Sequence, residues 1–389
     1  MMKHKKTLFF LKQNGNVPTN KGGLTMKKRV LSLLLAGMMI STMLVGCGST
    51  TQETVAETTA AETGTEAQAA DATDATDAKD KTYAIIIRSA GNPYAQKEMG
   101  GFEEAIEEYG GKCITKAPDE ATAEAQITMV NELVAQKVDC IAIAANDLDA
   151  LQPAVQAANQ EGIEVISVDG QLNAESRLTH VNQADSEMIG RTLIQATSEM
   201  IGGEGQFAIL SATSQSSNQN VWIDWMKEEM ATGNYQDMEL VEVAYGDDEF
   251  QKSVDQTEAL LSNYPDLKAI VAPTTVGIMA AAKVVTDKGL IGDVVVTGLG
   301  LPSEMSEYIS NGACPWMYLW NPIDVGYLAG WTSIAIEEGK ITGAIGDKFS
   351  ASRLGDYEIT DAGDGGTEVL LGAPFKFDPD NIDEWKEVY

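Results

Sequence analysis

An acidic residue follows a strand-like apolar run near the middle of the chain, in the stretch Val165–Gly170. The residues before Asp169 have strand character, and a glycine follows it. A carboxylate at the end of a buried parallel strand lies in the crevice at the carboxyl edge of the sheet, where open α/β sheets bind ligands. The stretch Val294–Gly300 has a similar form. Two such strand ends that face each other would form a cleft.

Further polar and aromatic residues follow other strand-like runs. An arginine supplies a forked donor, amides both donate and accept, and rings offer apolar faces. Together with a carboxylate, these groups are the usual composition of a pocket for a hydroxylated ligand. The candidate ligand-binding residues are Arg88, Asn92, Tyr94, Asp169, Asn218, Gln219, Asn220, Pro273, Thr274, Thr275, Trp320 and Asn321.

Each candidate also has a purely structural interpretation, and the sequence leaves the choice open. Arg88 could pair with a structural acid, and Asn92 before Pro93 could only form a turn. Asp169 could cap a turn through Gly170, and Asn218 could be the N-cap of the next helix. Tyr94 could pack in the core and Trp320 at a hinge. Thr274 and Thr275 could cap a helix. Trp222 is assigned to the core, and Gly246–Asp248 to a solvated turn.

The elements that must position these residues alternate between strands and helices. Short, continuous apolar runs indicate strands covered on both faces, which is typical of a parallel sheet. The strands are expected at 83–87, 112–115, 139–144, 163–168, 178–181, 207–210, 240–244, 268–271, 293–297 and 316–319. Helices are expected at 94–109, 121–136, 148–160, 185–201, 221–231, 250–262, 276–288, 303–310 and 324–338. The same order of elements occurs twice, which predicts an α/β protein of two similar doubly wound parallel-sheet lobes joined by hinge crossings.

This pattern suggests a division into lobes. Residues 81–170 plus about 301–320 are expected to form an N-terminal lobe, and 171–300 plus part of 321–389 a C-terminal lobe. The first crossing between lobes is expected just after Asp169, and another at Trp320–Asn321. The segments after the last helix are expected to tie the lobes together.

Charge and cysteine content exclude several classes of function. The formal charge of the 389-residue chain is −31, although residues 1–46 hold eight basic residues and no acid. Such a surface repels nucleic acid, which excludes a nucleic-acid partner. His180 is the one histidine after residue 46, so no cluster of histidines can bind a metal, and no metal site or cofactor is expected. Cys113 and Cys140 fall in strands on either side of the first strand, so these residues and Cys314 are expected as free thiols.

The N-terminal segment has the pattern of an exported, lipid-anchored protein. A basic stretch at 26–29 is followed by an apolar run to Val45 and by Gly46-Cys47, which resembles a bacterial lipoprotein signal. Residues 1–46 are therefore expected as a non-mature leader, with the signal at 26–46. Cys47 is expected to be lipidated, and residues 47–80 to form a disordered acidic tether. The expected location is the outer face of the bacterial cytoplasmic membrane.

Several longer runs resemble one protein family. The runs NQNVW (218–222), APTTVGI (272–278), TGLGLPSEM (297–305) and LWNPIDVGYLAG (319–330) are similar to those of type I periplasmic sugar-binding proteins of ABC importers, in the branch that binds rhamnose or autoinducer-2. The resemblance covers about residues 83–385. It implies that the candidate residues line a ligand site between two lobes. Autoinducer-2 receptors carry a lysine at the position of Arg88, an Asp-Gln pair at Asn218-Gln219, and Pro-Asp-Ala at Pro273–Thr275. The residues found here are more similar to those of the rhamnose binders.

The resemblance implies a binding protein, not an enzyme. It predicts a monomeric lipoprotein that takes up a small rhamnose-like sugar and passes it to an ABC permease and its ATPase. The alternative is a receptor protein for autoinducer-2 or another signal. Neither a G-x-S-x-G motif nor a set of paired cleft acids supports a hydrolase.

Overall fold

The computed structural model describes residues 78–389, which belong to one compact unit. The predicted lipoprotein signal, Cys47 and most of the acidic tether lie outside the described residues. The tether prediction is wrong for its last three residues. Ala78–Asp80 form a short 3-10 helix, η2, and the Lys79 ammonium lies 5.7 Å from the ring centroid of Tyr109.

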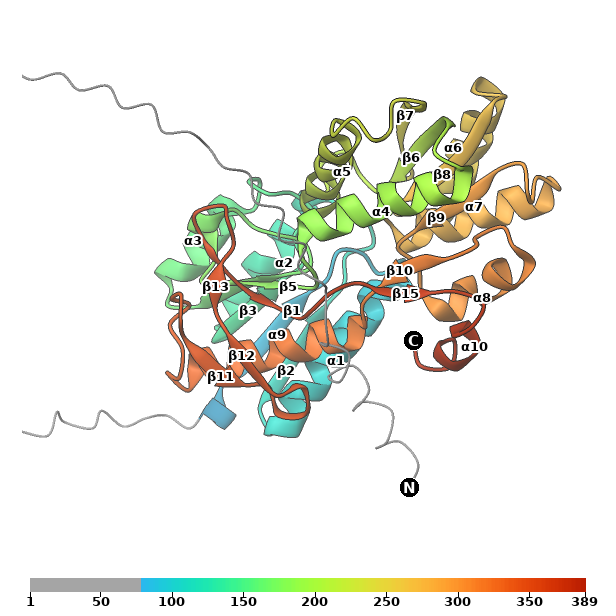
Figure 1. Cartoon of the computed structure of the whole chain (residues 1–389). Helices are drawn as coiled ribbons and strands as arrows, with labels where there is room; N and C mark the ends of the chain where they lie inside the picture. Colours follow the sequence, from blue (N-terminus) through green and yellow to red (C-terminus); the bar gives the residue numbers. More distant parts are fainter. Residues whose placement is uncertain (1–77) are drawn as a thin grey trace, which may run out of the picture. The chain divides into compact units, whose positions relative to one another are not determined.

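The first of the two large sheets has seven strands in the order β13-β14-β5-β4-β3-β1-β2 (Figure 1). Apart from β13, which pairs antiparallel with β14, the strands are parallel. Tyr83 of β1 lies opposite both Cys113 and Cys140, as predicted, and all three described cysteines are free. The strands are β1 (Thr82–Ile86), β2 (Lys112–Lys116), β3 (Cys140–Ile143), β4 (Glu164–Val168), β5 (His180–Asn182), β13 (Thr360–Asp361) and β14 (Thr367–Leu370).

Helices cover both faces of this sheet, because alternate residues of each strand carry apolar side chains to opposite faces. Ile86 packs in one cluster with Val130 and Val155 of α2 (Ala123–Gln136) and α3 (Gln152–Gln160). Ile85 packs in the other cluster with Phe102 of α1 (Pro93–Tyr109) and with residues of α9 (Pro322–Glu337). We call this sheet with α1, α2, α3 and α9 the first lobe.

Helices α1 and α9 lie side by side, although more than 200 residues separate them in the sequence (Figure 1). A glycine makes this approach possible, because a Cβ atom at Gly326 would lie 1.8 Å from the carbonyl oxygen of Glu98. The run GYLAG, singled out in the sequence, therefore permits close helix packing.

The second large sheet has four parallel strands in the order β7-β6-β8-β9. Its strands are β6 (Gly205–Ser211), β7 (Met238–Tyr245), β8 (Leu267–Ala272) and β9 (Val295–Gly298). Its helices pack in pairs, α4 (Ser186–Ile201) with α5 (Ser217–Met230), and α6 (Phe250–Asn263) with α7 (Thr275–Asp287). We call this group the second lobe. The predicted α/β architecture with two doubly wound parallel sheets is confirmed.

The late segments belong to different lobes than predicted. Residues 301–320, assigned to the first lobe, form α8 (Pro302–Asn311) and β10 (Met317–Leu319), which contact α7 and β9 of the second lobe. β10 pairs with β15 (Phe375–Phe377), and α10 (Ile382–Trp385) packs on α8. Most of residues 321–371 return instead to the first lobe, as α9, β11 (Lys348–Ser350), η4 (Ser352–Leu354), β12 (Asp356–Glu358), β13 and β14. Packing between distant segments decides these positions.

The first crossing between lobes was predicted just after Asp169, and the structure places it later in the chain. The chain does not leave the first lobe there, but forms η3 (Ala174–Ser176) and then β5, which pairs with β4. The first crossing lies between β5 and α4, at 183–185. The predicted crossing at Trp320–Asn321 joins β10 to α9, and a third joins β14 to β15. Among residues 78–389, no helix combines the length and apolar character needed to span a bilayer.

Candidate functional site

Residues at the carboxyl ends of strands in both lobes meet in one buried cluster. Arg88 follows β1 and Asp169 follows β4 in the first lobe. Asn218 lies in the first turn of α5 after β6, and Thr275 begins α7 after β8 in the second. All four are at most 6% exposed. The facing strand ends thus bring the predicted residues together.

Arg88 links the two lobes directly. Its Nη1 donates to Asn218 Oδ1 at 2.8 Å, and its Nη2 donates to Ser216 Oγ at 2.8 Å. The Asn146 side-chain amide donates to the Arg88 carbonyl oxygen at 2.9 Å, which fixes the backbone behind the guanidinium. The forked donor is therefore held in one orientation.

Asp169 adopts a left-handed backbone conformation with φ of 51°, which a non-glycine residue rarely takes. Its Oδ2 accepts from Asn218 Nδ2 at 3.2 Å, and Tyr94 Oη donates to its Oδ1 at 3.4 Å. Trp320 Nε1 in turn donates to Tyr94 Oη at 2.6 Å. Burial raises the pKa of Asp169 to about 6, and the Arg88 charge opposes this effect. The carboxylate is thus an acceptor shared between the lobes.

A second contact between lobes joins the start of α1 to the start of α7. Asn92 Oδ1 caps α1 by accepting from the Tyr94 amide at 2.9 Å, and it also accepts from Thr275 Oγ1 at 3.2 Å. Thr274 Oγ1 donates to Asp248 Oδ1 at 2.8 Å, and Pro273 is buried next to it.

Asp248 was missed by the sequence analysis. It is 6% exposed with φ of 55°, so the assignment of Gly246–Asp248 to a solvated turn is wrong for this residue. The signal that could have found it is an acid in the loop after a strand, here the third residue after β7. Sequence reasoning also left out Ser216, which contacts Arg88 from the N-cap position of α5.

Three predicted residues direct their side chains to local partners. Gln219 accepts from Ser211 Oγ at 2.7 Å and from the Ala212 amide at 2.9 Å. Asn220 donates to the Ser214 carbonyl at 3.0 Å, and Asn321 accepts from the Ile323 amide as the N-cap of α9. These side chains hold the loops around the cluster.

Three aromatic rings, including that of Tyr94, pack together, and the Tyr94 hydroxyl bonds to Asp169. The ring of Trp320 lies 6.4 Å from that of Tyr94 and 5.8 Å from that of Trp222, both in edge-to-face geometry. The centroid distances are those of favourable aromatic pairs. Trp222 is 2% exposed, which agrees with its assignment to the core.

Several buried polar atoms near this cluster have no hydrogen-bond partner within residues 78–389. They are Arg88 Nε, Asp248 Oδ2, Trp222 Nε1 and both carboxyl oxygens of Glu98. Buried polar groups in native proteins are normally paired, so these atoms are available to hydrogen-bond a ligand. No group of three or more potential metal-ligating side chains occurs in the described part of the chain.

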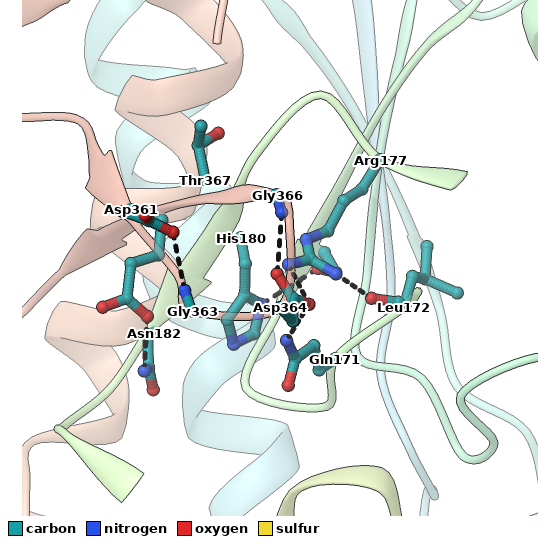
Figure 2. Close-up of polar contacts among 12 residues, drawn as sticks. Gln171, Leu172, Arg177, His180, Asn182, Asp361, Gly363, Asp364, Gly366 and Thr367 are labelled. Atoms are coloured by element: carbon teal, nitrogen blue, oxygen red, sulfur yellow. Dashed lines mark hydrogen bonds and ion pairs between the residues drawn. The ribbon is translucent and has the colours of Figure 1, made fainter. Parts of the chain in front are cut away.

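The loop after Asp169 is held by a turn from the late part of the chain (Figure 2). Asp364 Oδ2 forms an ion pair with Arg177 Nη2 at 2.7 Å and accepts from Gln171 Nε2 at 2.7 Å. The Gly366 amide donates to Asp364 Oδ1 at 2.9 Å. The Arg177 side chain is fully buried. The contacts of Asp364 with Arg177 and Gln171, called the Asp364 clasp below, therefore fix the loop that follows Asp169.

Two α/β lobes whose strand ends share one buried polar cluster are the architecture of a bilobal ligand-binding protein. The chain belongs to the periplasmic binding protein domain family, whose model matches residues 83–341. It is similar to an ABC transporter solute-binding protein from Clostridium phytofermentas, solved with bound L-rhamnose. The identity is 54%, the TM-score is 0.79, and the match covers 80% of this chain and 99% of that one. Since this family binds solutes without converting them, the chain is not an enzyme.

More distant relatives share the fold. LsrB from Clostridium saccharobutylicum in complex with AI-2 is 20% identical with a TM-score of 0.74, over 78% of this chain and 99% of that one. The D-ribose/D-allose-binding protein of Pseudomonas aeruginosa is 25% identical over 203 residues, which are 50% of this chain and 61% of that protein. The match thus spans less than two thirds of this curated relative.

Proposed function

We propose that this protein, on the outer side of the cell membrane, captures a small, neutral, rhamnose-like sugar between its two lobes and delivers it to an ABC permease. The observation that carries the proposal is the cluster of Arg88, Asp169 and Asn218. Donors and acceptors from both lobes are buried there beside aromatic rings. Sugar hydroxyls both donate and accept, and the C–H face of a sugar ring packs on aromatic side chains.

The hydrogen bonds between the lobes suggest how a ligand would favour closure. Arg88, Asp169 and Asn92 each bond to a residue of the other lobe. A sugar that takes over these bonds while also pairing Arg88 Nε and Asp248 Oδ2 interacts better with the closed than with the open arrangement. A ligand shifts an equilibrium only through such differential affinity, and hinge closure is the corresponding motion.

The 54% identical relative supports a deoxyhexose as the ligand, because it was solved with L-rhamnose. The rings of Tyr94 and Trp320 lie next to Asp169, where a methyl group and ring C–H groups of a sugar can pack on them. The relative bound to AI-2 supports only the fold at its 20% identity, so AI-2 enters as a competing ligand in the test.

Isothermal titration calorimetry on the full-length chain in detergent tests this proposal. The ligands are L-rhamnose, D-ribose, D-arabinose and AI-2. We expect L-rhamnose to bind most tightly, and Arg88→Ala to weaken its binding at least tenfold. Asn220→Ala is the matched control, because the Asn220 amide donates to the local Ser214 carbonyl and belongs to the same helical turn. Binding of AI-2 in preference to every sugar would instead support the signal receptor, and no binding at all would refute the proposal.

The proposal includes a lipid anchor at Cys47, supported by the lipoprotein-like sequence around it. Two acyl groups are the physical expectation, because a single chain binds a membrane only marginally. Metabolic labelling with radioactive palmitate should mark the wild-type protein, and Cys47→Ala should release it into the medium. An unlabelled protein that stays with the membrane would contradict the anchor.

Uptake of labelled sugar tests delivery to the permease. Cells lacking this gene should take up less labelled sugar than wild-type cells, and unchanged uptake would contradict delivery.

A further inference from the structure

Glu98 is a buried acid that the fold does not explain. It lies on α1 one helical turn after Tyr94, and its accessible surface is 0%. Neither of its carboxyl oxygens has a hydrogen-bond partner in the described part of the chain. A carboxyl group buried without a partner destabilises a protein, so its presence calls for a compensating role.

The surroundings of Glu98 are those of the ligand cluster. Residues four apart share one face of a helix, so Glu98 and Tyr94 lie on the same side of α1. Burial raises the pKa of Glu98 well above its usual range; Asp169 raises it further and Arg88 opposes this. Glu98 in turn helps to raise the pKa of Tyr94, after burial and Asp169. The charged and titratable groups that interact with Glu98 therefore come from the loops after β1 and β4 and from α1 itself.

We propose that Glu98 is a ligand-binding residue whose carboxyl group hydrogen-bonds a hydroxyl of the bound sugar. This inference rests on the function proposed above and adds a residue from the middle of a helix to the strand-end set. A neutral carboxyl group offers one donor and one acceptor, which matches the two roles of a hydroxyl group. A neutral Glu98 adds no charge to a cluster that already holds Arg88, Asp169 and Asp248, as suits an uncharged ligand.

A purely structural Glu98 would behave differently from a ligand-binding one. If it only fills space between helices, Glu98→Leu should remove the cost of a buried polar group and leave sugar affinity unchanged. If it contacts the ligand, the same substitution should leave a sugar hydroxyl without its partner. Affinity and thermal stability then change separately.

The test compares the full-length wild-type chain with four variants in detergent, using L-rhamnose or, failing that, whichever panel sugar binds the wild type. Titration calorimetry gives Kd, and thermal unfolding without sugar gives Tm. We expect Glu98→Gln, which keeps a donor and an acceptor, to stay within about threefold of the wild-type Kd. Glu98→Leu should weaken binding at least about tenfold without lowering Tm. Glu103→Leu, at an exposed position of the same helix, is the matched control and should change neither quantity.

Glu98→Asp covers the case in which the leucine variant does not fold. It keeps the carboxyl group but withdraws it by one methylene, so we expect a loss of about tenfold. Wild-type affinity in either Glu98→Leu or Glu98→Asp would overturn the assignment of Glu98 and leave the proposed function standing. A wild-type chain that binds none of the sugars would overturn both proposals together.

Discussion

Replacing Asp169 with asparagine should weaken ligand binding and, at neutral pH, stabilise the ligand-free protein. Asp169 is buried, and burial raises its pKa from 3.8 to about 6 despite the nearby Arg88. The folded protein therefore holds this proton more tightly than the unfolded chain does. As the pH rises from about 4 to 6, the unfolded chain loses its proton first, so the free energy of unfolding falls.

The size of this effect follows from the two pKa values. A pKa difference of one unit between the folded and unfolded states corresponds to about 1.4 kcal/mol of stability. The shift from 3.8 to about 6 therefore corresponds to roughly 3 kcal/mol. Asparagine has a similar shape and no proton to lose. We therefore compare the free energy of unfolding of Asp169→Asn with that of wild type at each pH. The variant should gain roughly 3 kcal/mol relative to wild type between pH 4 and pH values above 6.

Chemical denaturation without ligand, at pH values from 3.5 to 8, measures this difference. The control is Asp266→Asn, at an exposed aspartate on the loop before β8. Titration with L-rhamnose at pH 7 should show at least a tenfold weaker affinity for Asp169→Asn. A flat difference curve for Asp169→Asn would refute the assignment of a raised pKa, and wild-type affinity would refute its place in the site.

Four further substitutions test other contacts. Arg88→Lys keeps the charge but replaces the planar fork, whose two nitrogens reach Asn218 and Ser216, with a single nitrogen. Calorimetry should therefore show affinity between those of wild type and Arg88→Ala; an affinity equal to wild type would contradict a forked contact. Asp364→Ala leaves the fully buried Arg177 guanidinium without its charge partner, so urea denaturation should show a loss of about 3 kcal/mol, and no loss would contradict the Asp364 clasp. His180→Gln should reduce acid sensitivity: burial lowers the pKa of His180 from 6.5 to about 3, so the wild type loses stability as the pH falls below about 6.5, by about 1.4 kcal/mol per unit. If the free energy of unfolding of His180→Gln and of wild type changed with pH in parallel, the lowered pKa of His180 would be excluded. Gly326→Ala forces a Cβ against the Glu98 carbonyl and should lower stability by about 1–3 kcal/mol in the same urea assay; a neutral result would show that α1 and α9 adjust freely.

Sequence reasoning found most of the strand-end site because its signal is local. A strand-like run followed by a polar residue and a glycine or proline can be read without knowledge of the rest of the chain. This rule located Arg88, Asn92 and Asp169, and the structure places them in one buried cluster with Asn218 and Thr275. Asp248 escapes this rule, because it is the third residue after β7 and the glycine comes before it.

Glu98 shows where such reasoning fails. A glutamate in the middle of a predicted helix is normally exposed, and nothing beside it in the sequence marks it as buried. Its burial depends on the packing of α1 in the first lobe and on the Asp169 strand end, which is distant in the sequence. The directions taken by Gln219 and Asn220 were equally hidden, because one helical turn contains positions that face the cluster and positions that do not.

The sequence by itself determined the succession of strands and helices, the two parallel sheets and the strand ends that carry the polar residues. These features depend on periodicity and on neighbours within a few residues. Only the tertiary structure decided which lobe receives residues 301–371, that β5 precedes the first crossing, and that Asp364 fixes the loop after Asp169. The physical reason is that such contacts join segments up to about 200 residues apart, and their stability comes from surfaces that form only when the whole chain has packed.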